Sequence, residues 1–256
     1  MQSLKDRIVF VTGASSGIGE ATAEAFAALG SKILMCARRV ERLEKLAETL
    51  EYEHKVAVHY FRLDVRDLAA VDTAVAGLPP EWRAIDVLVN NAGLSRGLEK
   101  LPSGLVEDWE EMIDTNVKGL LYVSRAVLSG MIERGRGHII NIGSIAGEEV
   151  YPGGNVYCAS KFAVRALSKC LRLDLNGTPI RVSEIAPGMV ETEFSLVRFH
   201  GDAERAGKVY QGLTPLGPDD VADAVVWCAT RPAHVNVSQV TVMPTAQAST
   251  TLIHRK

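Results

Sequence analysis

The sequence predicts an α/β fold, a single-domain Rossmann-type doubly wound sheet of seven mainly parallel strands with helices on both faces. Short β-branched runs alternate with longer stretches of helical periodicity along almost all of the 256 residues, and parallel neighbours require such crossover connections. A glycine-rich segment at residues 13–19 follows the first apolar run, which favours an open sheet over a closed α/β barrel. No linker-like stretch or shift in composition marks a boundary. We therefore expect one domain over residues 1–256.

The expected strands are short apolar or β-branched runs, as buried parallel strands are. They cover residues 8–12, 32–37, 56–63, 85–89, 138–142, 181–185 and 239–242. Apolar residues at helical spacing predict the helices between them. These are expected from Ile18 to Gly30 and over about 40–50, 107–133 and 156–175.

An irregular stretch at about 187–218 interrupts this alternation. It is rich in glycine and proline among mixed charges, and a segment of this length in a compact domain is usually a functional lid or a disordered loop. Phe194, Phe199 and Tyr210 offer apolar anchors, which favours a lid that contains a short helix. We call residues 187–218 the lid and expect a C-terminal tail over about 244–256.

Composition excludes several classes of protein. Hydrophobic residues make up 47% and charged residues 23% of the chain, which excludes a disordered chain, a collagen-like fibre and a coiled coil. Basic and acidic residues number 28 and 31. Such a balanced chain has no general electrostatic attraction to nucleic acid or to an anionic membrane, so a local site must bind any phosphate.

Cysteine and histidine usage and the N-terminus give further expectations. The four cysteines are scattered, so we expect reduced core thiols and no disulfide scaffold. The histidines show no paired-ligand spacing, so no metal is expected. The chain shows neither a signal-peptide pattern nor an apolar run long enough to span a membrane, which predicts a cytoplasmic protein.

The glycine-rich segment is a candidate dinucleotide site. Gly13, Gly17 and Gly19 stand between the first expected strand and the first helix, with Ser15, Ser16 and Ile18 among them. Glycines allow a tight turn and close approach of a diphosphate, and the helix N-terminus offers free N–H groups and a positive dipole end. Glycine turns are common in α/β proteins, but a strand before and a helix after this one favour dinucleotide binding.

Two arginines predict which dinucleotide binds. At the end of the second strand an NAD site places an acidic residue against the ribose, whereas an arginine there accommodates the 2′-phosphate of NADP. This chain has Arg38 and Arg39 at that point, and guanidinium groups bind phosphate in bidentate geometry. The pattern favours NADP(H) as cofactor. The alternative is an arginine pair that is solvated or paired with Glu41.

A tyrosine and a lysine predict acid–base chemistry. Tyr157 and Lys161 are four residues apart, so they project from one face of the expected helix. An ammonium within about 4–6 Å of a phenol lowers its reference pKa of about 10, which gives a proton donor and acceptor usable near neutral pH. Such a pair also arises by chance and is weak evidence alone.

Ser144 and Asn116 strengthen this interpretation. Ser144 follows the fifth expected strand, at the carboxyl edge where open sheets bind ligands. Asn116 lies inside the long helix expected at 107–133, where asparagine has a poor propensity. It is either a site residue or a core amide bonded to backbone.

Together these features resemble the short-chain dehydrogenase/reductase family over essentially the whole chain. The matching elements occur in the family's order and spacing. They are the glycine segment from Thr12 to Gly19, Asn90-Asn91-Ala92-Gly93, Asn116, Ser144, Tyr157-x-x-x-Lys161 and Pro187-Gly188. The resemblance implies reversible hydride transfer between NADP and a carbon that bears a hydroxyl or carbonyl group.

The resemblance also implies roles for individual residues. Tyr157 would be the general acid/base, and Ser144 would hydrogen-bond the substrate oxygen. Lys161 would lower the pKa of Tyr157 and hold the nicotinamide ribose, and Asn116 would anchor a water of a proton relay. The implied cofactor contacts are Asp64 and Val65 at adenine, Asn91 near the adenosine, Gly93 where the cofactor approaches closely, Val190 and Thr192 at the carboxamide, and Arg38 at the NADP-selecting position. Ala92, Pro187 and Gly188 are further implied cofactor-binding residues.

Less general segments resemble one branch of the family. Residues 108–116, 153–157, 192–199, 232–236 and the C-terminal stretch resemble the NADP-dependent 3-hydroxy acid dehydrogenases. The resemblance implies the oxidation of serine, allo-threonine, 3-hydroxyisobutyrate or 3-hydroxypropionate, the last giving malonic semialdehyde. Arg198 in the lid would bind the substrate carboxylate, the alternative being a surface residue or an interface ion pair.

Two rival functions stay open: a broad-specificity NADPH-dependent carbonyl reductase of the same family and a non-catalytic NADP-binding sensor. The resemblance also implies a homotetramer, formed through the helix expected at 107–133 and its successor. The only other partner expected is a small-molecule substrate.

Overall fold

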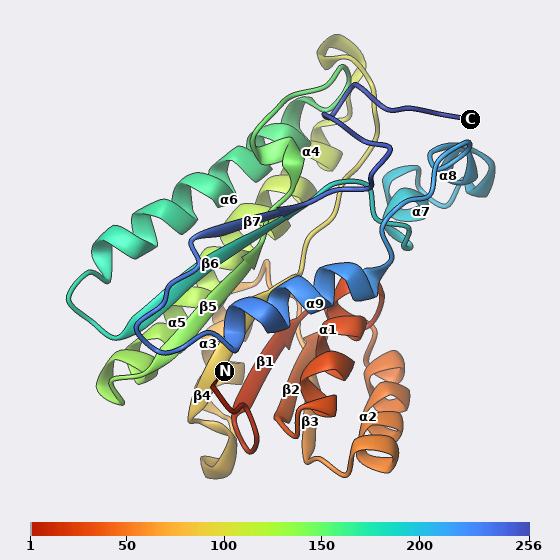
Figure 1. Cartoon of the computed structure of the whole chain (residues 1–256). Coiled ribbons are helices and arrows are strands. Elements are labelled where there is room, and N and C mark those ends of the chain that lie inside the picture. The colour runs from red at the N-terminus through yellow and green to blue at the C-terminus, as the bar shows by residue number, and fades with distance from the viewer. Residues whose placement is uncertain (1) are drawn as a thin grey trace.

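The computed structural model describes residues 2–256 and contains one seven-stranded sheet between two layers of helices (Figure 1). The strands are β1 (Ile8–Thr12), β2 (Lys32–Ala37), β3 (Val58–Arg62), β4 (Ile85–Asn90), β5 (Gly137–Ile142), β6 (Ile180–Pro187) and β7 (Gln239–Val242). Every neighbouring pair is parallel. The α/β class predicted from the alternating runs is confirmed.

The strand order is β3-β2-β1-β4-β5-β6-β7, so the direction of winding reverses between β1 and β4. In open α/β sheets the loops that diverge at such a reversal open a crevice beyond the carboxyl ends of the strands. The loops after β1 and β4 do lie together here, because a Cβ built on Gly13 would be 2.9 Å from the Cα of Ala92.

Helices cover both faces of the sheet. One layer contains α1 (Gly17–Ala28), α2 (Val40–His54) and α9 (Pro218–Ala229), and the other contains α3 (Leu68–Ala76), α5 (Leu120–Glu133) and α6 (Asn155–Asp174). Alternate residues of β1 supply the two cores, with Val9 and Val11 in the first and Ile8 and Phe10 in the second. Burial on both faces explains why the strands are continuous apolar runs. Helices α3 and α9 were not among the expected elements.

The helix expected at 107–133 is interrupted. It consists of α4 (Val106–Ile113), a π-helical segment η3 (Asp114–Gly119) and α5. Asn116 lies in η3, and single π-helical turns inside helices are frequent at functional sites. Short 3₁₀ segments lie elsewhere in the chain, at η1 (Pro80–Trp82), η2 (Leu101–Ser103) and η4 (Ile145–Gly147).

The lid contains two short helices, where one was expected. They are α7 (Phe194–Arg198) and α8 (Ala203–Lys208). The C-terminal tail reaches the lid, because the backbone N–H of Lys256 donates to the carbonyl of Gly212 at 2.8 Å. Figure 1 shows the tail passing above α7 and α8.

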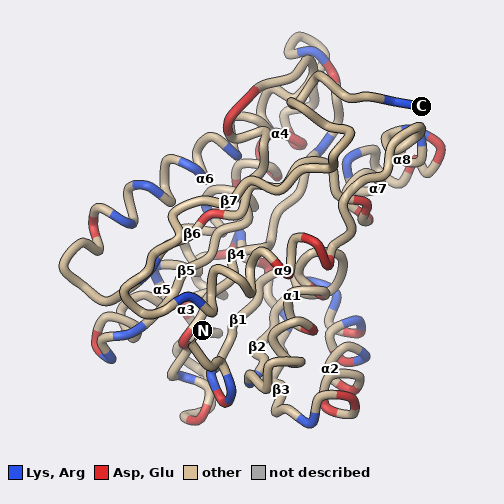
Figure 2. The backbone as a smooth tube through the Cα atoms, viewed as in Figure 1, with Lys and Arg blue, Asp and Glu red and all other residues tan. Residues whose placement is uncertain are grey.

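Charges and thiols are distributed over the surface and the core. Figure 2 shows acidic and basic residues interspersed on α2, in agreement with the nearly balanced composition, whereas α6 carries mainly basic residues. Cys36, Cys158 and Cys228 are buried as expected, but Cys170 is exposed, so the expectation that all four thiols lie in the core is wrong for Cys170. Within residues 2–256, none of the helices has the length and apolar character needed to cross a membrane.

Candidate active site

A cavity of about 340 Å³ opens at the carboxyl edge of the sheet. It is lined by most of the expected site residues, namely Gly13, Ser15, Ser16, Gly17, Ile18, Arg38, Arg39, Asp64, Val65, Asn91, Ala92, Gly93, Ser144, Tyr157, Lys161, Pro187, Gly188, Val190 and Thr192. Three expected residues lie outside this lining: Gly19, Asn116 and Arg198. The loops after six different strands therefore meet in one place, as the parallel sheet requires.

The glycine segment forms the turn from β1 into α1. Gly13 and Gly17 have φ angles of +66° and +58°, which side chains with a Cβ rarely adopt. A Cβ on Gly19 would overlap the amide of Asn91. Gly19 thus allows close packing behind the loop and does not face the cavity.

Asn91 and Thr12 hold this loop in place. The Asn91 side-chain amide donates to the carbonyls of Thr12 and Gly13 at 2.9 and 3.1 Å. The Thr12 hydroxyl in turn accepts from the backbone N–H groups of Asn91 and Ala92 at 3.1 and 3.0 Å. Asn91 therefore positions the loop, and Thr12, the first residue of the motif, supports it, a role that the sequence did not predict.

Arg38 and Arg39 each pair with a carboxylate from a distant part of the chain. Arg38 contacts Glu111 of α4 at 3.2 Å. Arg39 contacts Glu193 of the lid at 2.9 Å and donates to the hydroxyl of Ser16 at 2.8 Å. The alternative of pairing with Glu41 is wrong. Neither Glu111 nor Glu193 was expected at the site, because a single glutamate on a helix or loop carries no pattern of its own.

The segment after β3 carries Asp64 and Val65. The Asp64 carboxylate accepts from Arg66 at 2.6 Å, and this hydrogen bond lowers the pKa of Asp64 below its usual value. Val65 is buried and packs closely against η3, since a Cβ on Gly119 would be 2.6 Å from its Cγ2. Leu63 and Cys36 complete this apolar end of the cavity.

Ser144, Tyr157 and Lys161 meet at the other end. All three are buried, at 7–8% exposure. Lys161 Nζ donates to the carbonyl of Ile142 at 2.8 Å and lies 6.0 Å from the centre of the Tyr157 ring. Burial lowers the pKa of Lys161 to about 8.

The pKa of Tyr157 departs from the expectation. Burial raises it above 10, while the charge of Arg198 and a hydrogen bond with Ser144 act in the opposite direction. Desolvation disfavours the charged phenolate, and Arg198 is the cation that opposes it. Lys161 is not among the groups that shift this pKa here, so its expected effect on Tyr157 stays a prediction.

Asn116 is a buried amide bonded mainly to backbone. Its side chain donates to the carbonyl of Leu94 and accepts from the N–H of Leu94, both at 2.8 Å, and donates to Ser160 at 3.0 Å. These contacts match the core-amide alternative and fix the loop beside Gly93. The neighbouring Thr115, which was not expected at the site, also lines the cavity, but its hydroxyl is buried and has no partner among residues 2–256.

Arg198 lies at the end of α7, over the catalytic tyrosine expected from the motif. Its Nε donates to Ser95 Oγ at 3.1 Å, and its Nη2 donates to the Tyr151 hydroxyl at 3.0 Å. Its Cζ is 5.4 Å from the ring centre of Tyr157 and 4.9 Å from that of Phe194. In the described part of the chain no carboxylate pairs with it. Arg198 is partly exposed, so the substrate role and the alternatives of a surface residue or an interface ion pair all stay predictions.

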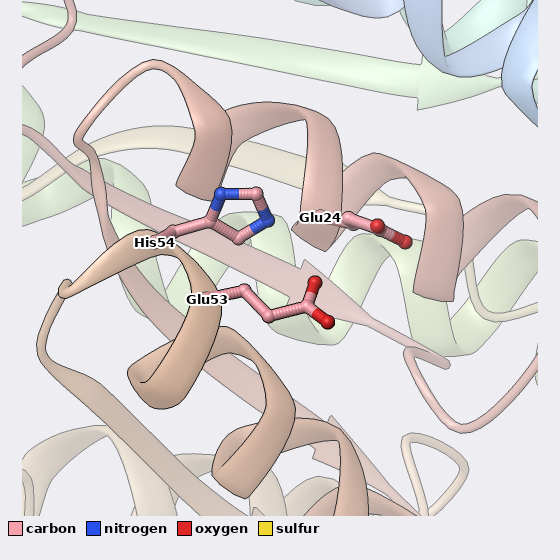
Figure 3. A group of neighbouring side chains, drawn as sticks. All are labelled: Glu24, Glu53 and His54. Carbon is pink, nitrogen blue, oxygen red and sulfur yellow. The ribbon is translucent and has the colours of Figure 1, made fainter.

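One group of possible metal ligands lies on α1 and α2. The ligand atoms of Glu24, Glu53 and His54 lie within 4.8 Å of one another, as Figure 3 shows. Both glutamates are exposed, and exposed carboxylates often gather without binding an ion. We therefore assign no metal site to these three residues.

Comparisons with known proteins agree with this geometry. The short chain dehydrogenase family matches residues 7–201. An NADP-dependent 3-hydroxy acid dehydrogenase, YdfG of Salmonella typhi, is 54% identical over 250 residues, which cover 97% of this chain and 99% of the relative. Sulfoacetaldehyde reductase 2 of Chromohalobacter salexigens is 48% identical over 94% of this chain and 95% of its own.

A solved structure is similar as well. The closed form of a serine dehydrogenase complexed with NADP+ superimposes with a TM-score of 0.91 and 51% identity. The match covers 97% of this chain and 100% of that one. The resemblance thus extends over nearly the whole chain.

Proposed function

Because the chain belongs to the short-chain dehydrogenase family, we propose that it transfers hydride reversibly between NADP(H) and the 3-hydroxyl of small 3-hydroxy acids. Serine, allo-threonine, 3-hydroxyisobutyrate and the 3-hydroxypropionate/malonic semialdehyde pair form this substrate class. The observation that carries the substrate class is the position of Arg198, a cation without a carboxylate partner in residues 2–256 that lies 5.4 Å from the Tyr157 ring.

The residues of the cavity fit NADP(H). The first-turn N–H groups of α1 lack intrahelical partners, and Ser16 makes no side-chain cap hydrogen bond to them, so they are available for the diphosphate. Arg38 and Arg39 border the same cavity and would hold the 2′-phosphate. Asp64, Val65, Asn91, Ala92 and Gly93 would form the adenosine side, and Pro187, Gly188, Val190 and Thr192 would hold the carboxamide.

Side chains of this protein would transfer the proton. When bound, NADP(H) supplies or accepts the hydride. Tyr157 would give its phenolic proton to the substrate carbonyl oxygen in reduction and take one back in oxidation. Ser144, within hydrogen-bonding reach of Tyr157, would hold that same oxygen. Lys161 would hold the nicotinamide ribose. Asn116 would anchor a water of the proton relay beside Lys161, as the family resemblance implies.

The relatives suggest why an arginine belongs at this place. Both 3-hydroxy acids and sulfoacetaldehyde carry an anionic group one carbon away from the carbon that reacts. The Tyr157 hydroxyl and the Arg198 guanidinium would engage these two groups of one small molecule. A guanidinium is well suited to either anion because it forms charge-assisted, bidentate hydrogen bonds.

A substrate panel tests this proposal. Reduction of NADP would be followed by absorbance with L-serine, allo-threonine and 3-hydroxyisobutyrate, and with neutral alcohols of similar size. We expect the anionic substrates to be preferred and Arg198→Ala to reduce kcat/KM for serine at least about thirtyfold, the loss of one charge-assisted contact. Equal losses on serine and on a neutral alcohol would reject the carboxylate role.

The same panel separates the rival functions. A broad carbonyl reductase would reduce aromatic ketones with NADPH as readily as small semialdehydes. A non-catalytic sensor would bind NADPH and turn over nothing, which is disfavoured because Ser144, Tyr157 and Lys161 are all present and lie together.

We also propose a cytoplasmic homotetramer. Leu121 of α5 and Phe162 and Leu173 of α6 expose 38%, 42% and 76% of their surface, which supports an interface along these two helices. Light scattering after size-exclusion chromatography would measure the assembly.

A further inference from the structure

Three consecutive residues after β4 hold the end of α7. Ser95 Oγ accepts from Arg198 Nε at 3.1 Å, Arg96 Nη1 donates to the carbonyl of Val197 at 2.6 Å, and the N–H of Gly97 donates to the carbonyl of Arg198 at 2.8 Å. We call Ser95, Arg96 and Gly97 the clasp. The direction in which Arg198 points is therefore set largely by the clasp and not by α7 alone, which has only five residues.

Arg96 has a second partner on its other side. Its Nε donates to Glu111 Oε2 at 2.7 Å, and both side chains are 18% exposed. Glu111 Oε1 contacts Arg38 at 3.2 Å and Arg66 at 3.5 Å. A continuous series of charged contacts thus connects Arg38, at the 2′-phosphate end of the cavity, through Glu111 and Arg96 to the residues of α7.

The carboxylate of Glu111 is shared among three guanidinium groups. Arg96 and Arg38 hold the pKa of Glu111 below its usual value against the effect of burial. The attraction in such a partly buried cluster is screened less than on an open surface. An Arg38 that turns toward a phosphate would leave Glu111 to Arg96 and Arg66, so the contact that supports the clasp would be kept or strengthened.

We propose that Arg96 and Glu111 are positioning residues that couple recognition of the 2′-phosphate at Arg38 to the placement of Arg198 over Tyr157. The inference rests on the proposed function, since it takes Arg38 as the phosphate contact and Arg198 as the anion contact. It explains how a cofactor with a 2′-phosphate would order the lid near the substrate, whereas a cofactor without it would not. Coupling free energies of this kind change affinities by about fivefold or more.

The first test measures order in the lid without using activity. Hydrogen exchange of the peptide spanning residues 194–200 is compared at saturating NADP+ and saturating NAD+. We expect NADP+ to slow exchange more than NAD+ in the parent protein, and the two cofactors to act equally in Arg96→Gln and Glu111→Gln. A difference between the cofactors that persists unchanged in both variants would overturn the proposal.

The second test measures specificity. Arg96→Gln is expected to reduce kcat/KM for an anionic substrate about tenfold while kcat/KM for a neutral alcohol changes less than about twofold. Arg136→Gln is a matched control, because Arg136 pairs with Asp86 at 2.8 Å, is 51% exposed and lies outside α5 and α6. Equal losses on both substrates would mean that Arg96 has only a structural role, and would overturn the proposal.

The two proposals can fail separately. If Arg198→Ala leaves the preference for anionic substrates unchanged, the carboxylate role of Arg198 is wrong whatever Arg96 does. If Arg198→Ala removes that preference and Arg96→Gln does not weaken it, the coupling is wrong and the proposed function stands.

Discussion

The guanidinium of Arg198 lies 5.4 Å from the ring of Tyr157, closer than the 6.0 Å that separates the Lys161 ammonium from the same ring. The charge of Arg198 lowers the pKa of the phenol, which burial otherwise raises. An arginine on the lid thus has an electrostatic influence on Tyr157, in addition to its proposed contact with an anionic substrate. Both effects would be lost together if α7 moved away.

Replacing Tyr157 with phenylalanine should abolish turnover and preserve cofactor binding. The phenolic oxygen is the only group lost, and general acid–base catalysis contributes about 10²–10⁴-fold. We expect Tyr157→Phe to lose at least about a hundredfold in kcat, with Kd for NADPH unchanged in a fluorescence titration. A variant within tenfold of the parent in kcat would contradict the acid–base role.

Replacing Arg38 with alanine should weaken the binding of NADP+ more than that of NAD+. The substitution removes one guanidinium from the expected 2′-phosphate site, and a hydrogen bond to a charged group contributes about 1.5–3 kcal/mol, or about 10–150-fold in Kd. Direct titration of both cofactors measures this change in Kd. Unlike a turnover assay, it does not also depend on the position of Arg198 in α7. If NADP+ and NAD+ lose affinity equally, the assignment of Arg38 is wrong.

Local patterns explain why the sequence predicted so much of the sheet and the cofactor end. Strands buried on both faces are apolar runs, and Gly13 and Gly17 are needed where φ is positive. The spacing of Tyr157 and Lys161 likewise reflects one helix, α6. Each of these features depends on residues that are close together in the chain, so a short stretch of sequence is enough to predict it.

The parts that escaped prediction depend on contacts between distant segments. Ser95 and Arg198 are separated by 103 residues and Arg39 and Glu193 by 154, and neither pair has a pattern of spacing. The π-helical segment around Asn116 was missed because its apolar spacing differs little from that of an α-helix. The pKa of Tyr157 was misjudged because spacing indicates that Lys161 is near, but not how strongly the phenol is buried.

Glu193 should oppose the binding of the 2′-phosphate. Its carboxylate contacts Arg39 at 2.9 Å and Arg42 at 2.8 Å, so it occupies a guanidinium that the phosphate would use. Removing the charge in Glu193→Gln should tighten NADP+ binding by about threefold to tenfold and leave NAD+ unchanged. Because these groups are about 40% exposed, the effect should shrink as salt is added.

A matched control for this prediction lies on the same lid. Glu204 is 80% exposed and pairs with Lys208 at 2.6 Å, so Glu204→Gln removes the same charge away from the arginines. Titrations at low and at physiological salt compare the two variants. Equal tightening for NADP+ and NAD+ in Glu193→Gln would show that the carboxylate does not face the phosphate.

His138 should make the folding stability depend on pH. The Ser183 hydroxyl donates to the carbonyl of Val237 at 2.6 Å, so it accepts from His138 Nε2 at 2.8 Å, and Nδ1 is left without a partner within the described chain. Burial, together with the charge of Arg181, lowers the pKa of His138 well below 6.5. The unfolded chain therefore binds a proton below about pH 6.5 that the folded protein excludes, so stability falls as the pH falls.

The size of this effect follows from the difference in proton binding between the folded and the unfolded chain. Below pH 6.5 the contribution of His138 should decline by about 1.4 kcal/mol per pH unit, and His138→Gln, which keeps an amide donor for Ser183, should remove that decline. Urea unfolding at pH 7.5, 6.5 and 5.5 measures it, with the exposed His234→Gln as control. If the free energy of unfolding of His138→Gln falls with pH as steeply as that of the parent, the acid sensitivity comes from other groups and the neutral, buried state of His138 is not its source.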